Sequence, residues 1–476
     1  MNIHWTEQVG LIRDKFIDDL QSFLSINSIE DMTTASEGKP FGLGVADALA
    51  FMLDGANRDG FKTKNLEGYA GYIELGEGEE QIGVLAHVDV VPTGDGWTTP
   101  PFQPNIREGR IYARGAIDDK GPALAAYYAL KIVRDSKLPL SKKVRLIIGT
   151  DEESGWLCMK RYAELEQLPE IGFSPDADFP IIHAEKGQIN PVLVLAEKNE
   201  EDSPSDWVLQ SFQAGDRVNM VPDQANAVVS LTDTGDEVST FTEIEHSFNQ
   251  FLKSNNIDGK LERGDNTLSF NVEGKAAHGM EPFEGINAGL LLASFLKSYT
   301  FQASAQSFLR LLTDVLHDDF YGVNIGMACE DEVTGKLTVN AGVLQYDLDR
   351  KATVKLNIRY PATVTPEQLT PNLTDILATI GWVIKDIRTS KAHHVPKDHP
   401  SIQTLQRVYE EQTGQEAALL FTGGATYARS MKYGVAFGAV FPGKEMTAHK
   451  KDEYAEIDDL IKAISIYAQA IYELAK

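Results

Sequence analysis

The chain has 476 residues, of which 42% are hydrophobic, and its 44 basic and 70 acidic residues give a formal net charge of −26. A single hydrophobic core stops growing at about 250–300 residues, so this length predicts two domains. The negative charge repels nucleic acids and anionic membrane surfaces, so we expect neither as a partner.

The N-terminal residues 1–20 space apolar side chains such as Trp5 and Val9 at helical intervals, which predicts a surface helix. This stretch lacks the apolar core and cleavage site of a signal peptide, and no segment is apolar for long enough to span a membrane. The only cysteines, Cys158 and Cys329, are too few for a disulfide framework. Together these features predict a cytoplasmic location.

Strand and helix patterns alternate between residues 70 and 190. Strands are expected at residues 70–76, 80–91 and 142–150, and a helix at residues 121–135 with Asp119 as its candidate N-cap. Such alternation is typical of an α/β sheet covered by helices on both faces. Functional residues of these sheets gather at the carboxyl ends of the strands.

The middle of the chain has an α+β pattern instead. A polar stretch at residues 196–207 predicts an exposed loop. Alternating strand patterns follow at residues 225–232, 266–274 and 352–361, and a helical block lies at residues 285–299. This change of pattern predicts that residues 190–390 form a separate domain.

The last part of the chain returns to buried strands and amphipathic helices. Helices are expected at residues 401–414, closed by Gly414, and at residues 457–476, with a buried strand at residues 433–443 between them. The simplest assembly is a mixed-sheet α/β domain built from residues 1–189 and 391–476. The α+β domain of residues 190–390 is then an insertion in it.

Five short segments end an apolar run with carboxylates or a histidine, beside glycine or proline. Their candidate functional residues are His87 and Asp89, Asp118, Glu152 and Glu153, Asp176, and His449. Taken singly, such a loop carboxylate is usually a turn or cap residue, and a lone histidine is usually a surface or core residue. Taken jointly, converging carboxylates repel one another unless cations hold them together.

Two divalent metal ions would supply that positive charge. A two-metal site needs terminal ligands for each ion and a carboxylate that bridges both, and His87, Asp118, Glu153, Asp176 and His449 can meet these needs. A further carboxylate must be free to act on a water molecule. Glu152, next to one ligand, can take that part.

The five segments together resemble the di-zinc metallopeptidase family of aminoacylases, desuccinylases and carboxypeptidase G-type enzymes. In that family a strand ends in H-x-D and is followed by G-x-x-D-x-K-G, an E-E pair, P-D and a late histidine. All five occur here in that order, from His87 to His449. H-x-D or E-E alone carries little weight, but the ordered set is highly specific.

The resemblance implies a ligand set for two zinc ions, although manganese and cobalt suit the same donors. His87 and Asp176 would bind one ion, Glu153 and His449 the other, and Asp118 would bridge them. In this family the peptide bond after the bridging aspartate is commonly cis, which here is the bond between residues 118 and 119.

Two more roles follow from the resemblance within the same segments. Asp89 would form a hydrogen bond with His87 and set its tautomer and basicity. Both side chains leave the same face of the strand, because they occupy alternate positions. Glu152 would act as the general base.

Two segments of the inserted domain, residues 215–227 and 274–282, match the lid domain of the family. Without the resemblance, their Gly, Asn and Pro content favours turns or a β-bulge. With it, Asn219 and His278 are expected at the substrate, with His278 as hydrogen-bond donor to the developing oxyanion. Arg359 would bind the terminal carboxylate of the substrate.

The loop at residues 421–429 resembles a glycine-rich loop that brings backbone N–H groups, Gly424 among them, to the same carboxylate. Related dipeptidases have a third glycine where Ala425 stands, and the added methyl group would crowd a close backbone approach. Met446 stands where relatives often have a second acidic residue, which bears on the surroundings of His449.

The segments around Asp118, Asp176 and Gly424, with a middle domain of some 200 residues, resemble the PepV-type branch of dipeptidases. The resemblance implies hydrolysis of dipeptides with a free N-terminus and a free C-terminal carboxylate. It also implies a monomer, because a lid domain of this size can supply His278 from within the same chain.

Two alternatives to a dipeptidase stay open. An N-acyl amino acid deacylase or desuccinylase would keep the fold and the metals, and the residues do not show where a free α-amine binds. A catalytically inactive metal-binding or scaffolding protein would have lost the base or a ligand, and none is missing here.

Overall fold

The computed structural model describes residues 4–196, 205–232, 237–348 and 352–476, and the side chains of residues 237–240 are not described. By contacts the chain divides into two compact units, Met1–Ala184 with His394–Lys476, and Glu185–His393. The second unit is thus an insertion in the first, and the predicted α/β architecture with an inserted α+β domain is confirmed. The domain boundaries placed after residues 189 and 390 stay predictions.

The first unit is built on a mixed sheet with the strand order β1-β2-β6-β3-β7-β22-β9-β20, in which β21 also pairs with β9. The strands are β1 (Lys62–Leu66), β2 (Ala70–Leu75), β3 (Gln81–His87), β6 (Lys143–Gly149), β7 (Ile171–Ser174), β9 (Ile181–Glu185), β20 (His393–His394), β21 (Leu419–Thr422) and β22 (Tyr433–Ala436). The central strands β6, β3, β7 and β22 run parallel, and β2 pairs with β6 in the antiparallel direction. Their carboxyl ends therefore meet at one edge of the sheet.

Helices cover both faces of this sheet. They are α1 (Trp5–Gly10), α2 (Arg13–Leu24), α3 (Leu43–Arg58), α4 (Lys120–Ser136), α5 (Leu157–Leu165), α10 (Pro400–Thr413) and α11 (Ile457–Ala475). Val84 and Ala86 of β3 belong to the core that includes α4 and α11, whereas Leu85 belongs to a second core with α5. The buried strand thus has apolar residues on both sides, as strands covered by two helix layers require.

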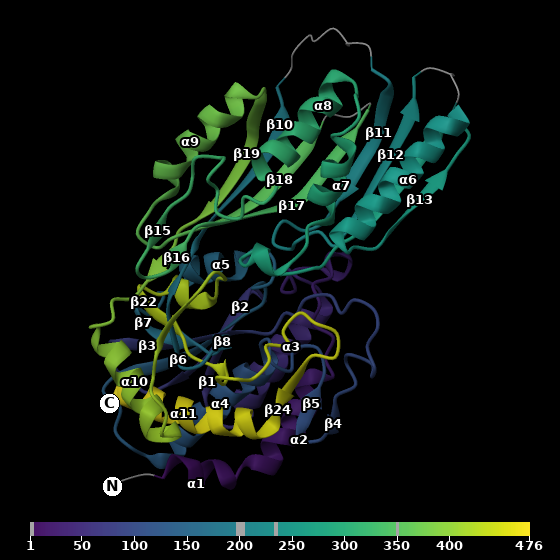
Figure 1. Cartoon of the computed structure of the whole chain (residues 1–476). Coiled ribbons are helices and arrows are strands. Elements are labelled where there is room, and N and C mark those ends of the chain that lie inside the picture. The colour runs from purple at the N-terminus through teal and green to yellow at the C-terminus, as the bar shows by residue number, and fades with distance from the viewer. Residues whose placement is uncertain (1–3, 197–204, 233–236, 349–351) are drawn as a thin grey trace. The chain divides into compact units, whose positions relative to one another are not determined.

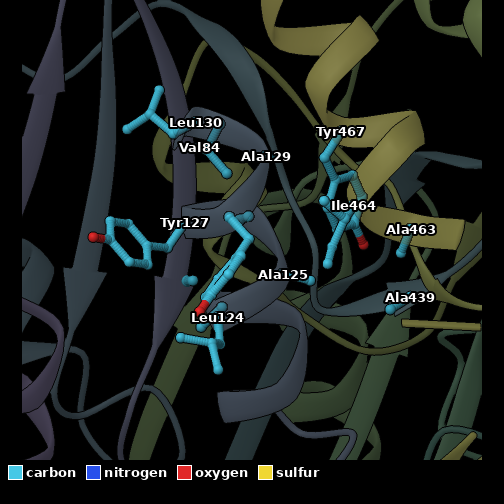
Figure 2. Close-up of a cluster of buried hydrophobic side chains, with 14 of the residues drawn as sticks. Val84, Leu124, Ala125, Tyr127, Ala129, Leu130, Ala439, Ala463, Ile464 and Tyr467 are labelled. Carbon is cyan, nitrogen blue, oxygen red and sulfur yellow. The ribbon is translucent and has the colours of Figure 1, made fainter. Parts of the chain in front are cut away.

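The contact between α4 and α11 lies at the centre of the larger core. Figure 2 shows Leu124 and Ala125 of α4 in one cluster with Ile464 and Tyr467 of α11. Ala125 and Ala129 are one helical turn apart, and their small side chains leave room for the larger ones opposite.

The second unit is an antiparallel sheet with the order β13-β14-β12-β11-β17-β18-β10-β19 (Figure 1). Its strands are β10 (Gly187–Leu195), β11 (Trp207–Ala214), β12 (Gln224–Leu231), β13 (Gly259–Arg263), β14 (Thr267–Glu273), β17 (Thr338–Asp347), β18 (Thr353–Tyr360) and β19 (Trp382–Ser390). The helices α6 (Glu237–Asn255), α7 (Ala288–Leu296), α8 (Ala303–Arg310) and α9 (Pro366–Thr379) pack against one face of it (Figure 1). Burial alternates along β14, as expected for a sheet with one covered face.

Short elements complete both units. In the first unit β4 (Asn105–Arg107), β5 (Arg110–Tyr112) and β24 (Tyr454–Glu456) form a small sheet, and β8 (Ala177–Asp178) pairs with β23 (Ala439–Val440). In the second unit β15 (Glu330–Asp331) pairs with β16 (Gly335–Lys336). Among the described residues, none of the helices combines the length and the hydropathy needed to cross a lipid bilayer.

Two predicted elements were wrong in detail. The single helix expected at residues 1–20 is two helices, α1 and α2, with a turn between them. The strand expected at residues 433–443 is also divided, because Gly438 has a φ of 81° between β22 and β23 and the two pieces join different sheets. Most of the loop expected at residues 196–207 lies outside the described residues.

Candidate metal-binding active site

The candidate site lies at the carboxyl ends of three neighbouring parallel strands. His87 is the last residue of β3, the pair Glu152 and Glu153 follows β6, and Asp176 follows β7. Since β3 lies between β6 and β7, these side chains start from adjacent positions. Sites of open α/β sheets form at this edge.

Asp118 and His449 reach the same place from loops. Asp118 precedes α4, and His449 lies in the connection from β23 to β24. The two oxygens of the Asp118 carboxylate face different histidines: Oδ1 is 3.1 Å from Nε2 of His87, and Oδ2 is 3.0 Å from Nε2 of His449. One carboxylate thus lies between two imidazoles.

Each histidine has a second carboxylate beside it. Glu153 Oε1 is 3.1 Å from Nε2 of His449, and Asp176 Oδ2 is 3.7 Å from Nε2 of His87. The geometry therefore forms two groups that share Asp118, which is the arrangement implied by the resemblance.

Glu152 lies inside this cluster as well. Ligand atoms of His87, Glu152 and Asp176 all fall within 4.8 Å of one another, as do those of His87, Asp118 and Glu153. Glu152 is therefore close enough to take part in reactions at the site, and also close enough to be a ligand.

The charges of the cluster are unbalanced without a metal ion. Burial and the neighbouring carboxylates raise the pKa of Glu152 and the pKa of Asp176 well above the ordinary range. At His449 burial alone would lower the pKa, but Asp118 and Glu153 outweigh it and raise the pKa to about 11. Partly buried carboxylates that outnumber their cationic partners, combined with imidazole nitrogens, are a donor set that fits divalent cations such as zinc, manganese or cobalt.

At Asp118 the pKa shifts in the opposite direction. Burial alone would raise its pKa, but hydrogen bonds to His449 and His87 outweigh it and lower the pKa below the ordinary range. The two imidazoles therefore favour the ionised form of Asp118.

Asp89 connects two of the candidate ligands. Its Oδ1 is 3.4 Å from Nδ1 of His87, and its backbone carbonyl oxygen is closer to the same nitrogen, at 2.9 Å. Its Oδ2 accepts a hydrogen bond of 3.0 Å from the backbone N–H of Glu153. The imidazole of His87 is thus oriented by the backbone carbonyl of Asp89 and not by the expected hydrogen bond to its carboxylate, whose Oδ1 has no hydrogen-bond partner among the described residues. The carboxylate holds the chain at Glu153.

The role of Asp119 differs from the predicted one. It occupies the N-cap position of α4, but its side chain does not cap the helix. Its Oδ2 accepts a hydrogen bond of 3.1 Å from the backbone N–H of His87. The peptide bond between Asp118 and Asp119 is cis, which confirms that expectation from the resemblance.

The turn after β6 fixes the backbone of Glu152. The carboxylate of Asp151 accepts hydrogen bonds from the backbone N–H groups of Gly155 and Leu157, at 2.7 and 2.8 Å. The indole N–H of Trp156 donates to the backbone carbonyl of Glu152 at 2.7 Å. The sequence places Asp151 in the same acidic run as Glu152 and Glu153 but predicts no role for it or for Trp156, because contacts with the main chain leave no periodic pattern in a sequence.

The loop around Gly424 differs from the expected arrangement in one respect. The backbone N–H of Gly424 donates to the hydroxyl of Thr422 at 2.9 Å, so this hydrogen must change partner to bind a carboxylate. The carbonyl oxygen of Gly424 accepts a hydrogen bond from Arg429. Ala425 is half-buried, and Met446 is exposed.

Asn219, His278 and Arg359 lie in the second unit, and the structure brings their segments together. The backbone N–H of Gly279 donates to the carbonyl of Asn219 at 2.7 Å, so the chain segments of Asn219 and His278 lie side by side. Arg359 of β18 is paired with Thr338 of β17, whose hydroxyl donates to the carbonyl of Met280. Arg359 is therefore near the segment that contains His278.

A buried asparagine holds one of these segments. The amide of Asn340 donates to the carbonyls of Val218 and Met220, both at 2.8 Å. These bonds fix the turn that carries Asn219. Asn340 was not singled out from the sequence, because a single asparagine in a strand pattern gives no signal of such a role.

Comparisons with known proteins show the family of the chain. The model of Peptidase family M20/M25/M40 matches residues 83–473. The chain is 48% identical over 474 residues to "Putative dipeptidase YtjP" of Bacillus subtilis (strain 168), covering 100% of both chains. It is 41% identical over 470 residues to "Putative dipeptidase" of Staphylococcus epidermidis (strain ATCC 12228 / FDA PCI 1200), covering 99% of both.

Among solved structures, the chain is similar to the di-peptidase Dug1p from Saccharomyces cerevisiae, with a TM-score of 0.57 and 13% identity over 98% of this chain and 97% of that one. At this identity the similarity shows the fold. The family match and the full-length relatives confirm the resemblance found in the sequence. The chain belongs to Peptidase family M20/M25/M40 and is a metallopeptidase.

Proposed function

We propose that the protein is a dipeptidase whose activity depends on two divalent metal ions. The observation that supports this most directly is the Asp118 carboxylate, which offers one oxygen to each of two groups of ligands. Relatives that match the whole chain at 40–48% identity carry names that describe them as dipeptidases, which supports the same class of substrate.

The proposed ligands are those expected from the sequence. His87 and Asp176 would hold one ion, Glu153 and His449 would hold the other, and Asp118 would contribute to both. When bound, two cations lower the pKa of a water molecule and neutralise negative charge that develops on the substrate. Zinc fits these donors, as do manganese and cobalt.

Glu152 is the proposed general base. It takes a proton from the attacking water and later gives it to the leaving amine. Its position supports this role, because an oxygen of Glu152 lies within 4.8 Å of ligand atoms of His87 and Asp176. Asp89 keeps the imidazole of His87 in the orientation needed for a ligand.

Four residues are proposed to bind the substrate. Arg359 and the backbone N–H groups around Gly424 hold the C-terminal carboxylate, since a guanidinium forks onto both oxygens. Asn219 and His278 are proposed to face the scissile bond, where His278 donates a hydrogen bond to the oxyanion.

One assay panel tests the proposal. Metal-depleted protein is compared with protein reconstituted with zinc, manganese or cobalt, on Ala-Ala, N-acetyl-alanine and N-succinyl-alanine. We expect no turnover without metal and hydrolysis of Ala-Ala after reconstitution. Faster hydrolysis of the N-acetyl or N-succinyl compounds would identify a deacylase or desuccinylase instead.

Two further properties are proposed with this function. The protein is a monomer in the cytoplasm, and the thiols of Cys158 and Cys329, both free, are compatible with a reducing compartment. Multi-angle light scattering should give the mass of one chain. A mass of two chains would refute the monomer.

A further inference from the structure

A buried ion pair in the first unit is not used by the proposed mechanism. Nη1 of Arg114 is 2.7 Å from Oε2 of Glu453, and the side chains are 1% and 0% exposed. Moving such a pair out of water has a desolvation cost that its attraction often does not offset, so a buried ion pair is weak evidence for a contribution to stability. This pair therefore calls for an explanation other than stability.

The carboxylate of Glu453 binds the segment that leads to Asp118. Its Oε1 accepts hydrogen bonds from the backbone N–H groups of Ile117 and Asp118, at 2.9 and 3.2 Å. Its Oε2 accepts one from the backbone N–H of Gly115, at 3.1 Å. Three donors within four residues thus converge on one carboxylate, which fixes the backbone from which the Asp118 side chain projects.

The guanidinium of Arg114 extends these contacts to two more segments. It donates to the carbonyls of Pro92 and Thr93, at 3.2 and 3.4 Å, in the loop that follows Asp89. It also donates to the carbonyl of Lys450 at 3.3 Å, directly after His449. The ion pair therefore joins the chain after β3, the chain before α4 and the loop of His449.

The segment of residues 115–118, which the Glu453 carboxylate binds, also has little conformational freedom of its own. Gly115 has a φ of 85°, and a side chain there would contact Val90 and Lys120. A residue with a Cβ would therefore be strained in this conformation. Backbone geometry and the Glu453 carboxylate together restrict this segment to one path.

We propose that Glu453 is a positioning residue, which with Arg114 orders the backbone of Asp118 and His449, two of the residues that would hold the metal ions. The inference rests on the ligand roles in the proposed function. Glu453 lies four residues after His449, so the loop that supplies one ligand also supplies the anchor for the shared one. Outer carboxylates of this kind influence metal affinity by ordering ligands that they do not replace.

The test is the variant Glu453→Gln. Glutamine keeps the size and one acceptor oxygen, but its NH₂ group would face N–H donors where the second oxygen now accepts. We expect the affinity for zinc, measured by competition with a chromophoric chelator, to fall by about 10- to 100-fold. We also expect lost activity to return partly when the metal concentration is raised.

The matched control is Glu74→Gln. Glu74 pairs with Arg145 at 2.7 Å and is nearly as buried, but the pair joins β2 to β6 away from the candidate ligands. This variant should lower the melting temperature and leave the zinc affinity within twofold of the parent. If Glu453→Gln behaves in the same way, the pair is only structural and the positioning role is refuted.

A milder variant, Arg114→Lys, keeps the charge and the hydrogen bonds of Glu453 but loses the forked contacts to Pro92, Thr93 and Lys450. If Glu453→Gln does not fold, Arg114→Lys decides the question. Folded Arg114→Lys with a zinc affinity below that of the parent supports the inference, and folded Arg114→Lys with the parental affinity overturns it. A parent protein that binds no metal refutes the proposed function, and this inference with it. A parent that binds two ions while both variants retain its affinity refutes the inference alone.

Discussion

Glu152 and Glu153 are neighbours in sequence, but their surroundings differ. Glu153 has its carboxylate at His449 and its backbone N–H at Asp89, so it is held in place. Glu152 is fixed through its main chain, by the indole of Trp156, and its carboxylate has no such contact with an imidazole of the described residues. This difference supports a ligand role for Glu153 and a proton-transfer role for Glu152.

Replacing Glu152 with alanine should therefore separate chemistry from metal binding. We expect kcat to fall by about 10²- to 10⁴-fold, the typical contribution of a general base, because no other side chain is proposed to take the proton. The bound metal, measured by atomic emission, should stay at two ions per chain. Turnover close to that of the parent would show that Glu152 is not the base.

At this scale the sequence predicts residue types and spacings well, but not contacts with the main chain. The alternation of His87 and Asp89 places both side chains on one face, and the structure has them within 3.4 Å. Asp119 was expected to cap a helix and instead accepts from the backbone of His87. Such acceptors depend on how distant segments meet, which no local pattern records.

At the scale of elements, the edge of the first sheet is held by charged side chains. Nε of Arg145 on β6 is 2.7 Å from Glu74 on β2, and the amine of Lys62 on β1 is 2.6 Å from the same carboxylate. Burial alone would raise the pKa of Glu74, but the hydrogen bonds from Lys62 and Arg145 outweigh it and lower the pKa below its ordinary value of 4.5. The contacts of Glu74 with Arg145 and Lys62 therefore stabilise the fold only while Glu74 is ionised.

The variant Glu74→Gln should show this dependence on pH. At pH 7 we expect the free energy of unfolding to fall by about 2–3 kcal/mol, between the values for exposed and fully buried pairs. The pKa of Glu74 is lowered on folding, so its contribution is complete above the ordinary value and is lost as the pH falls through the folded value. Denaturant unfolding of metal-free protein should thus give a difference between parent and variant that shrinks with acidification. A constant difference would contradict the assigned charge state.

The packing of α4 against α11 gives a second expectation. Ile464 is fully buried in the cluster of Figure 2, so Ile464→Ala should lower the free energy of unfolding by about 2–5 kcal/mol. The exposed Asp458 at the start of α11, paired with Arg13, is the control, and Asp458→Ala should cost less than about 1 kcal/mol. Thermal unfolding followed by circular dichroism compares the two, and equal losses would contradict the packing.

Periodicity predicts long helices such as α4 and α11 within one residue at each end, because burial on one face dominates their sequences. It fails at residues 433–443, where the apolar character continues across β22 and β23 although the strands belong to different sheets. The apolar pattern indicates burial there, but it does not record the change of direction at Gly438, which has a positive φ.

At the scale of the whole molecule, the proposed ligands all belong to the first unit, although they are spread from residue 87 to residue 449. Metal binding should therefore stabilise that unit by mass action, by about 4 kcal/mol when the free metal is 1,000 times its Kd. Removing the metal with a chelator should increase amide hydrogen exchange in the segments after β3, β6 and β7. Exchange within β11, β12 and β14 of the second unit should stay the same, and a uniform increase would contradict the assignment.

The insertion of one unit in the other was predictable because the pattern of elements changes twice along the chain. The substrate-binding roles proposed for Asn219, His278 and Arg359 follow only from the resemblance, since each residue alone is ordinary in its strand or turn. The structure adds that Asn340 and Thr338 hold their segments.

The position of Asp118 between two imidazoles has a consequence for metal loading. If the Asp118 carboxylate binds both ions, the first ion to bind draws electron density from this carboxylate. The carboxylate then attracts the second ion less strongly. The two places then cannot fill independently, and a titration should resolve a tight step and a looser one. The looser ion would be the one lost first during purification, so preparations with a single ion per chain would be an expected product of dialysis.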